Sequence, residues 1–136
     1  MLKDFNISKF KKMKPPSDNT FDAMQEIKAL KKIPLNKKFV KDYDNIEAAF
    51  AKTAKEQDVD YDKKVASKLI TASAPIILKL KKHFDRPRPK ELAKKMNIKI
   101  KDIEMDSMKT ASYPSGHTAQ GILIAKVLGD KYPKAK

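Results

Sequence analysis

Apolar residues recur at intervals of three and four along most of this chain, which predicts a largely α-helical fold. Phe21, Met24, Ile27 and Leu30 show the pattern clearly, and Pro34 ends that run. The same periodicity predicts helices over residues 20–32, 39–57, 62–83 and 115–129, with a shorter one over 90–96. We therefore expect an all-α helical bundle.

Several residues inside these stretches refine the expectation. Pro75 should kink the helix over 62–83 or split it in two. Asp42, Asp44 and Glu47 lie near the start of the helix over 39–57, where the helix dipole favours carboxylates. Residues 97–110 alternate weakly, which fits a strand and an irregular connection equally well.

The two glycines of the last predicted helix have different expected roles. Gly129 is placed as a C-cap, because glycine readily takes the conformation that ends a helix. Gly121 lies earlier, where a missing side chain would allow another helix to pack closely.

The polar, lysine-rich start of the chain separates from the helical part. Residues 1–19 read as a basic arm that ends in a turn around Pro15 and Pro16, and residues 20–136 read as one helical domain. A length of 136 residues is typical of a single domain.

The high net positive charge of the chain does not by itself indicate a nucleic-acid-binding protein. The chain has 31 Lys and Arg against 17 Asp and Glu, a formal net charge of +14. Nearly all the positive charge is lysine spread along the chain, and there is no Trp. Nucleic-acid surfaces usually rely on arginine and clustered aromatic residues, so nucleic-acid binding is not favoured as the main function. An acidic partner for the basic surface remains an alternative.

The chain has no cysteine, and its apolar runs are too short to span a bilayer. Its first residues contain no apolar core of a signal peptide. We therefore expect a soluble protein without a transmembrane segment, which is cytoplasmic if the chain is complete.

Candidate chemistry begins with the segment from Tyr113 to Thr118. Ser115 is a favoured N-cap, and Gly116 lets the backbone approach a ligand closely. Free N–H groups at the start of the following helix would favour an anion, and His117 would lie in the first turn. An ordinary capped helix with an exposed histidine is the alternative.

A second segment, from Lys81 to Pro89, strengthens the anion hypothesis. It contains Arg86 and Arg88, the only arginines, and His83, the only other histidine. Arginine offers a planar fork to phosphate oxygens, and lysine offers a point charge. The alternative is a basic helix end that the helix dipole stabilises.

Together these segments carry a resemblance to a known family. Lys81-x6-Arg88-Pro89 followed by Pro114-Ser115-Gly116-His117 resembles the first two signature motifs of the type 2 phosphatidic acid phosphatase and vanadium haloperoxidase superfamily. Within it, the sequence is most similar to the soluble class A bacterial non-specific acid phosphatases. The resemblance spans roughly residues 15 to 133 and implies an all-α bundle of that type, here lacking its C-terminal helices.

The resemblance implies a role for each matching residue. Lys81 and Arg88 would bind phosphate oxygens, with Ser115 adding its hydroxyl and Gly116 its backbone N–H. His117 would be the general acid that protonates the leaving alcohol. The implied activity is hydrolysis of phosphate monoesters through a phosphohistidine intermediate, without a metal or another cofactor, although vanadate could mimic the phosphate.

One part of the family pattern is missing. These 136 residues contain no Ser-Arg-x5-His-x3-Asp motif, which supplies the nucleophilic histidine of the family. Three explanations stay open: a fragment of a longer enzyme, a chain completed by another polypeptide, or an inactive relative that binds phosphate or serves a structural role. Without the missing helices an apolar face would be exposed, and we expect a homo-oligomer or a completing chain to cover it.

Overall fold

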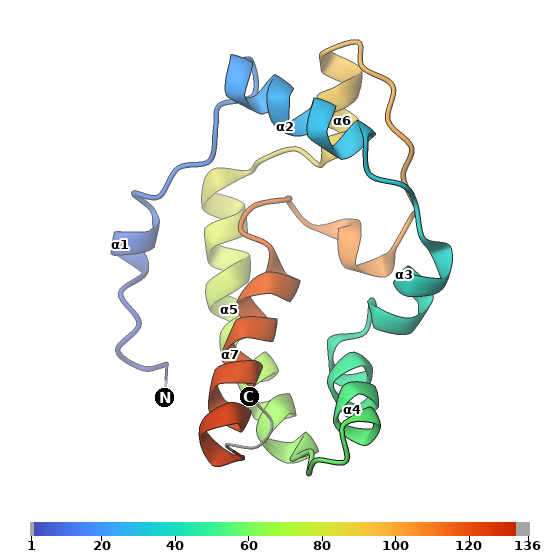
Figure 1. Cartoon of the computed structure of the whole chain (residues 1–136). Helices are drawn as coiled ribbons and strands as arrows, with labels where there is room; N and C mark the ends of the chain where they lie inside the picture. The colour runs from blue at the N-terminus through green and yellow to red at the C-terminus, as the bar shows by residue number, and fades with distance from the viewer. Residues whose placement is uncertain (1, 133–136) are drawn as a thin grey trace. The chain divides into compact units, whose positions relative to one another are not determined.

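The computed structural model describes residues 2–132 of the chain, and every regular element among them is helical (Figure 1). The prediction of an all-α chain is confirmed, and no strand occurs within 2–132. Residues 97–105 are therefore an irregular connection, and residues 106–109 form a short 3-10 helix. The helices are α1 (Ile7–Phe10), α2 (Phe21–Lys31), α3 (Lys37–Tyr43), α4 (Ile46–Glu56), α5 (Lys63–Phe84), α6 (Pro89–Lys95) and α7 (Gly116–Lys131), with the 3-10 helix η1 (Asp106–Lys109) before α7.

The chain divides into two compact units, which we call unit 1 and unit 2. Unit 1 contains residues 1–5, 38–77 and 115–136, and unit 2 contains residues 6–37 and 78–114. Helix α5 contributes to both, with residues up to Ile77 in unit 1 and residues from Leu78 in unit 2. Most of the predicted N-terminal arm, from Asn6 onward, groups with unit 2.

Unit 1 is built on small and aliphatic side chains that α5 and α7 bury together. Ala66 and Leu69 of α5 meet Ile124 and Leu128 of α7, and Phe50 of α4 packs against this cluster. Ile124 is completely buried. Helix α4 also packs on α7 (Figure 1).

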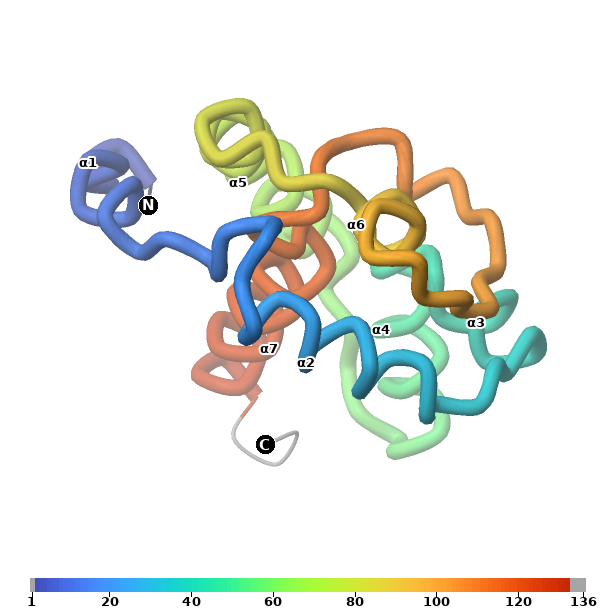
Figure 2. Tube along the Cα trace, turned by 90° about the horizontal axis from the view of Figure 1, so that it is seen from above, coloured from blue at the N-terminus to red at the C-terminus, as the bar shows by residue number. Residues whose placement is uncertain are grey.

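Unit 2 has a smaller core between α2 and α6. Helices α2 and α6 lie against each other (Figure 2). Ala23 and Ile27, four residues apart on one face of α2, pack on Leu92 and Ala93 of α6. Helix α2 begins at an N-cap, where the Thr20 side chain accepts a hydrogen bond from the N–H of Ala23 at 3.2 Å. The partly buried Met96, Ile98 and Ile100 complete the core.

The predicted helix over 39–57 is wrong, because the structure has two helices there. Asn45 is extended (φ −86°, ψ 110°), and its side chain accepts a hydrogen bond from the N–H of Ala48 at 2.9 Å. Asparagine is a strong N-cap, so it begins α4 and separates it from α3. Asp44 consequently lies between the two helices and outside the first turn of either.

Three other details of the predicted helices needed the structure. Pro75 lies inside a continuous α5, so the helix is not split: proline disturbs only one turn, and buried residues on both sides keep the helix packed. Gly129 is not a C-cap, because α7 continues to Lys131. Gly121 is not required for packing, since a Cβ there would lie 3.8 Å from Ile46 Cδ1, an ordinary contact.

We predict that Ile124→Ala lowers the free energy of unfolding by about 2–5 kcal/mol, because it leaves a cavity among side chains that cannot collapse into it. Ile122 in the same helix is 65% exposed, so Ile122→Ala should cost about 0.5 kcal/mol or less. Urea unfolding measured by circular dichroism compares the two. Equal losses would contradict the placement of the core.

A second prediction concerns Asp62, whose carboxylate joins the start of α5 to the end of α7. It accepts hydrogen bonds from the N–H of Val65 at 3.0 Å and from Lys131 Nζ at 2.5 Å. The hydrogen bond from the Lys131 ammonium lowers the pKa of Asp62 below its ordinary 3.8, and the hydrogen bond from the Val65 N–H lowers it further. The charged Asp62 carboxylate therefore stabilises the folded state at pH values above the ordinary carboxyl pKa. This stabilisation is lost as the pH falls through the lowered pKa of Asp62.

Asp62→Asn keeps a helix cap but removes the charge. The melting temperature of the variant should lie below that of the wild type at neutral pH, and the two should converge in acid. A difference that is the same at neutral and acid pH would show that the ion pair with Lys131 contributes nothing.

Candidate functional site

Lys81 is a buried cation near the C-terminal end of α5, in unit 2. It is 7% exposed, and its Nζ donates a hydrogen bond to the carbonyl oxygen of Ala111 at 2.5 Å. Burial lowers the pKa of Lys81 below its ordinary 10.5, and the positive charge of Arg88 lowers it further. The Lys81 ammonium is therefore hydrogen-bonded to a neutral backbone carbonyl, in a buried environment that disfavours its positive charge.

Arg88 lies beside Lys81 and is fixed on the same stretch of backbone. It occupies the extended N-cap position of α6 (φ −67°, ψ 153°), which the following Pro89 favours. Its Nε donates to the carbonyl oxygen of Thr110 at 2.7 Å, and Nη2 donates to that of Ser107 at 3.0 Å. These two bonds use Nε and Nη2 of the guanidinium and do not involve Nη1. Burial also lowers the pKa of Arg88, against the opposing effect of the Glu91 carboxylate.

The backbone that accepts these bonds leads directly into the second motif. Ser112 Oγ donates to the carbonyl oxygen of Pro87 at 2.8 Å, and Ser112 N–H donates to that of Arg86 at 2.9 Å. The rings of Tyr113 and Phe84 are nearly perpendicular, and their centroids lie 5.0 Å apart. Unit 2 thus holds the first motif against the residues that precede Ser115.

Arg86 has a different task from Arg88. Its guanidinium pairs with the Glu26 carboxylate of α2. The first motif therefore contains one arginine that has an acidic partner and one that is held by carbonyl oxygens. This distinction could not be made from the sequence.

Ser115 begins α7 in unit 1 as predicted. Its Oγ accepts hydrogen bonds from the Thr118 N–H at 3.2 Å and from the Thr118 hydroxyl at 3.0 Å. Both bonds use the oxygen as acceptor, so the hydroxyl hydrogen can still be donated. Gly116 is the first residue of the helix, where backbone N–H groups have no partner within the helix.

His117 is held by Asp44, a residue that did not enter the sequence-based site. Its Nε2 lies 2.5 Å from the backbone carbonyl oxygen of Asp44 and 3.7 Å from the Asp44 carboxylate. A carbonyl oxygen only accepts, so Nε2 carries the hydrogen in this arrangement. The signal that could have found Asp44 is the Asp44-Asn45 pair, a combination typical of a turn between two helices.

The structure therefore brings the predicted residues together in two groups. Lys81 and Arg88 share one backbone segment in unit 2, whereas Ser115, Gly116 and His117 form the start of α7 in unit 1. His83, the other histidine, is exposed. Its ring makes an edge-to-face contact with the Phe84 ring, and the two ring centroids lie 4.9 Å apart. Within residues 2–132 this contact joins it to an aromatic ring, not to the kind of carboxylate that would orient a nucleophile.

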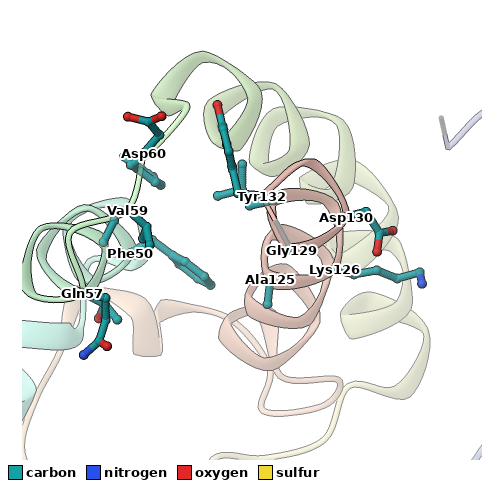
Figure 3. A pocket seen from close by; sticks show the side chains of 13 residues that line it. Phe50, Gln57, Val59, Asp60, Ala125, Lys126, Gly129, Asp130 and Tyr132 are labelled. Atoms are coloured by element: carbon teal, nitrogen blue, oxygen red, sulfur yellow. The ribbon is translucent and has the colours of Figure 1, made fainter. Parts of the chain in front are cut away.

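A pocket of about 710 Å³ lies in unit 1 between α4 and the C-terminal half of α7 (Figure 3). Phe50 and Val59 face Ala125 and Gly129 across it, whereas Lys126 points away. None of the predicted site residues lines this pocket. Within residues 2–132 no group of three or more His, Cys, Asp or Glu side chains is arranged for a metal ion.

None of the comparisons with family models, curated proteins and solved structures found a match to this chain. Among the described residues, no helix is both long enough and apolar enough to cross a membrane.

Burial of Lys81 gives a testable pH dependence. The folded state disfavours its charged form, so the unfolded chain binds more protons at pH values between the lowered pKa and 10.5. The unfolding free energy of the wild type should therefore rise with pH relative to Lys81→Met, which has no charge to bury. Urea unfolding of both proteins at neutral and alkaline pH measures this difference. A constant difference would show that Lys81 is solvated in solution.

Proposed function

We propose that this chain binds the phosphate group of a phosphate ester, with Lys81 and Arg88 as the cations that hold it. The observation that carries the proposal is that both cations are fixed by carbonyl oxygens of residues 107–111. Carbonyl groups orient a cation without neutralising it. Two neighbouring positive charges, one of them buried, thus favour an anion that bears more than one negative charge.

The charges around the pair support this proposal. Among the salt bridges of residues 2–132, none includes Lys81 or Arg88, and the carboxylate that acts on Arg88 is that of Glu91. Burial, and after it repulsion by Arg88, lowers the pKa of Lys81, and the negative charge of a bound phosphate would oppose both effects. Phosphate binding and the positive charge of Lys81 would therefore stabilise each other.

The catalytic part of the proposal rests on the two sequence motifs. By its resemblance to the class A acid phosphatases, the chain would be a phosphoric monoester hydrolase of the all-α acid phosphatase and haloperoxidase type. Ser115 and Gly116 would bind the phosphate oxygens, and His117 would protonate the leaving alcohol. A histidine nucleophile from outside these residues would complete the reaction.

A second function is favoured by the position of His83. The chain contains two histidines, and His83 is exposed beside Phe84. Without a nucleophile, the same residues would bind phosphate and release it unchanged. The second candidate is therefore an inactive relative that acts as a phosphate-binding or interaction protein.

We predict that Arg88→Ala weakens the binding of inorganic phosphate and of vanadate by about tenfold or more, because it removes charge-assisted hydrogen bonds. Lys90→Ala removes the same charge from an exposed neighbour and should leave the affinity nearly unchanged. Isothermal titration calorimetry at neutral pH measures both variants. Equal affinities of all three proteins would contradict the assignment of Arg88.

The enzymatic part is measured separately, by hydrolysis of p-nitrophenyl phosphate from acid to neutral pH with a chelator present. If the chain is a complete catalyst, His117→Ala should reduce turnover by about a hundredfold or more, since general acid catalysis typically contributes that much. Phosphate binding without turnover would show that these residues bind phosphate but do not hydrolyse the ester by themselves. Absence of both would overturn the proposed function.

A further inference from the structure

Positive charge is distributed unevenly between the two units. Unit 2 contains nineteen Lys and Arg against eight Asp and Glu, a net charge of +11, whereas unit 1 contains twelve against nine, a net of +3. The two units are nearly equal in length, so the difference reflects composition. An asymmetry of this size is typical of a surface that meets a polyanion or an anionic membrane.

The charge of unit 2 is accompanied by exposed apolar side chains. Residues 28–37 form the end of α2, the connection that follows it and the first residue of α3 (Figure 2). Every one of them is exposed. We call this stretch the 28–37 segment. Four lysines alternate in it with aliphatic residues, and its sequence contains no acidic residue. Leu30 is 40% exposed, Ile33 61% and Leu35 45%.

The local backbone lets these aliphatic residues act together. The N–H of Ile33 donates to the carbonyl oxygen of Leu30 at 3.1 Å, which continues the helical turn beyond Lys31. Residues three apart in a helical turn share a face, so Leu30 and Ile33 point to the same side. Lysine stems can extend beside such residues and keep their ammonium groups at a charged surface.

We propose that the 28–37 segment binds the surface of an anionic lipid bilayer. Its aliphatic side chains would enter the boundary between headgroups and acyl chains, and Lys28, Lys31, Lys32 and Lys37 would meet the anionic headgroups. The start of unit 2 repeats this composition on a smaller scale, with exposed Phe10 and Met13 among four lysines between residues 9 and 14.

A nucleic acid fits this segment less well. Single strands are held by aromatic stacking, and the 28–37 segment contains no aromatic residue. Both arginines, which serve best for recognition of a phosphate backbone, donate to partners within unit 2. Exposed leucine and isoleucine would gain little from a phosphate backbone, whereas a bilayer would bury them.

The test is co-sedimentation with phosphatidylcholine vesicles, with and without about one third phosphatidylserine. The wild type should bind the anionic vesicles and not the neutral ones. Lys31→Gln with Lys32→Gln should weaken binding about tenfold or more, since each lysine near an anionic surface contributes about a factor of five. Lys63→Gln with Lys64→Gln removes the same charge from an exposed pair in unit 1 and should change binding little.

The aliphatic residues are tested in the same way. Ile33→Ser with Leu35→Ser should weaken vesicle binding at unchanged net charge, whereas Ile122→Ser, at an exposed position of α7, should not. Equal effects of the 28–37 and unit 1 variants would overturn the proposal, as would binding that persists on neutral vesicles. Failure to bind any vesicle would also overturn it, including the case in which the chain binds an oligonucleotide or an acidic protein instead.

The proposal stands apart from the proposed phosphate site. Lys31→Gln with Lys32→Gln should leave the affinity for inorganic phosphate unchanged, and Arg88→Ala should leave vesicle binding nearly unchanged. Failure of one proposal can therefore be distinguished from failure of the other.

Discussion

Much of unit 2 is organised around the cost of burying positive charge. An ammonium that leaves water needs polar partners, and for Lys81 the partner is a backbone carbonyl that the chain presents just before its second motif. Arg88 uses two further carbonyls of the same segment. Because these bonds orient the cations but leave their charge, they order an irregular connection and at the same time create a place that favours an anion.

The elements that could be predicted from sequence are those with strong local determinants. The periodic faces of α2, α5 and α7 gave helices whose ends lie within two residues of the predicted ones, and Thr20 and Ser115 cap as their side chains favour. The break at Asn45 was missed because an apolar face continues across it, although the cap itself was visible in the sequence. Gly129 was misplaced because buried packing of Leu128 and its neighbours outweighed the preference of glycine for a helix end.

The site shows the same limit in another form. Residue type and spacing selected Lys81, Arg88 and His117 as chemical candidates. They could not reveal that backbone carbonyls far along the sequence hold the first two, because a carbonyl has no residue-specific signal. Nor could they pair His117 with Asp44, since that contact depends on the turn between α3 and α4. Arg86 and Arg88 look equivalent in sequence, and only the Glu26 carboxylate distinguishes them.

The two kinds of positive charge in unit 2 obey different physics. Lys81 and Arg88 are partly withdrawn from solvent and fixed in direction, so their attraction for an anion in direct contact is poorly screened by salt. The lysines of the 28–37 segment are exposed and flexible, and their combined field extends only about a Debye length, roughly 8 Å at physiological ionic strength. Raising the salt concentration therefore separates the two: it should weaken the surface attraction long before it affects a phosphate held by fixed donors. A single net charge of +14 conceals this difference, which lies in burial and in partners rather than in the number of lysines.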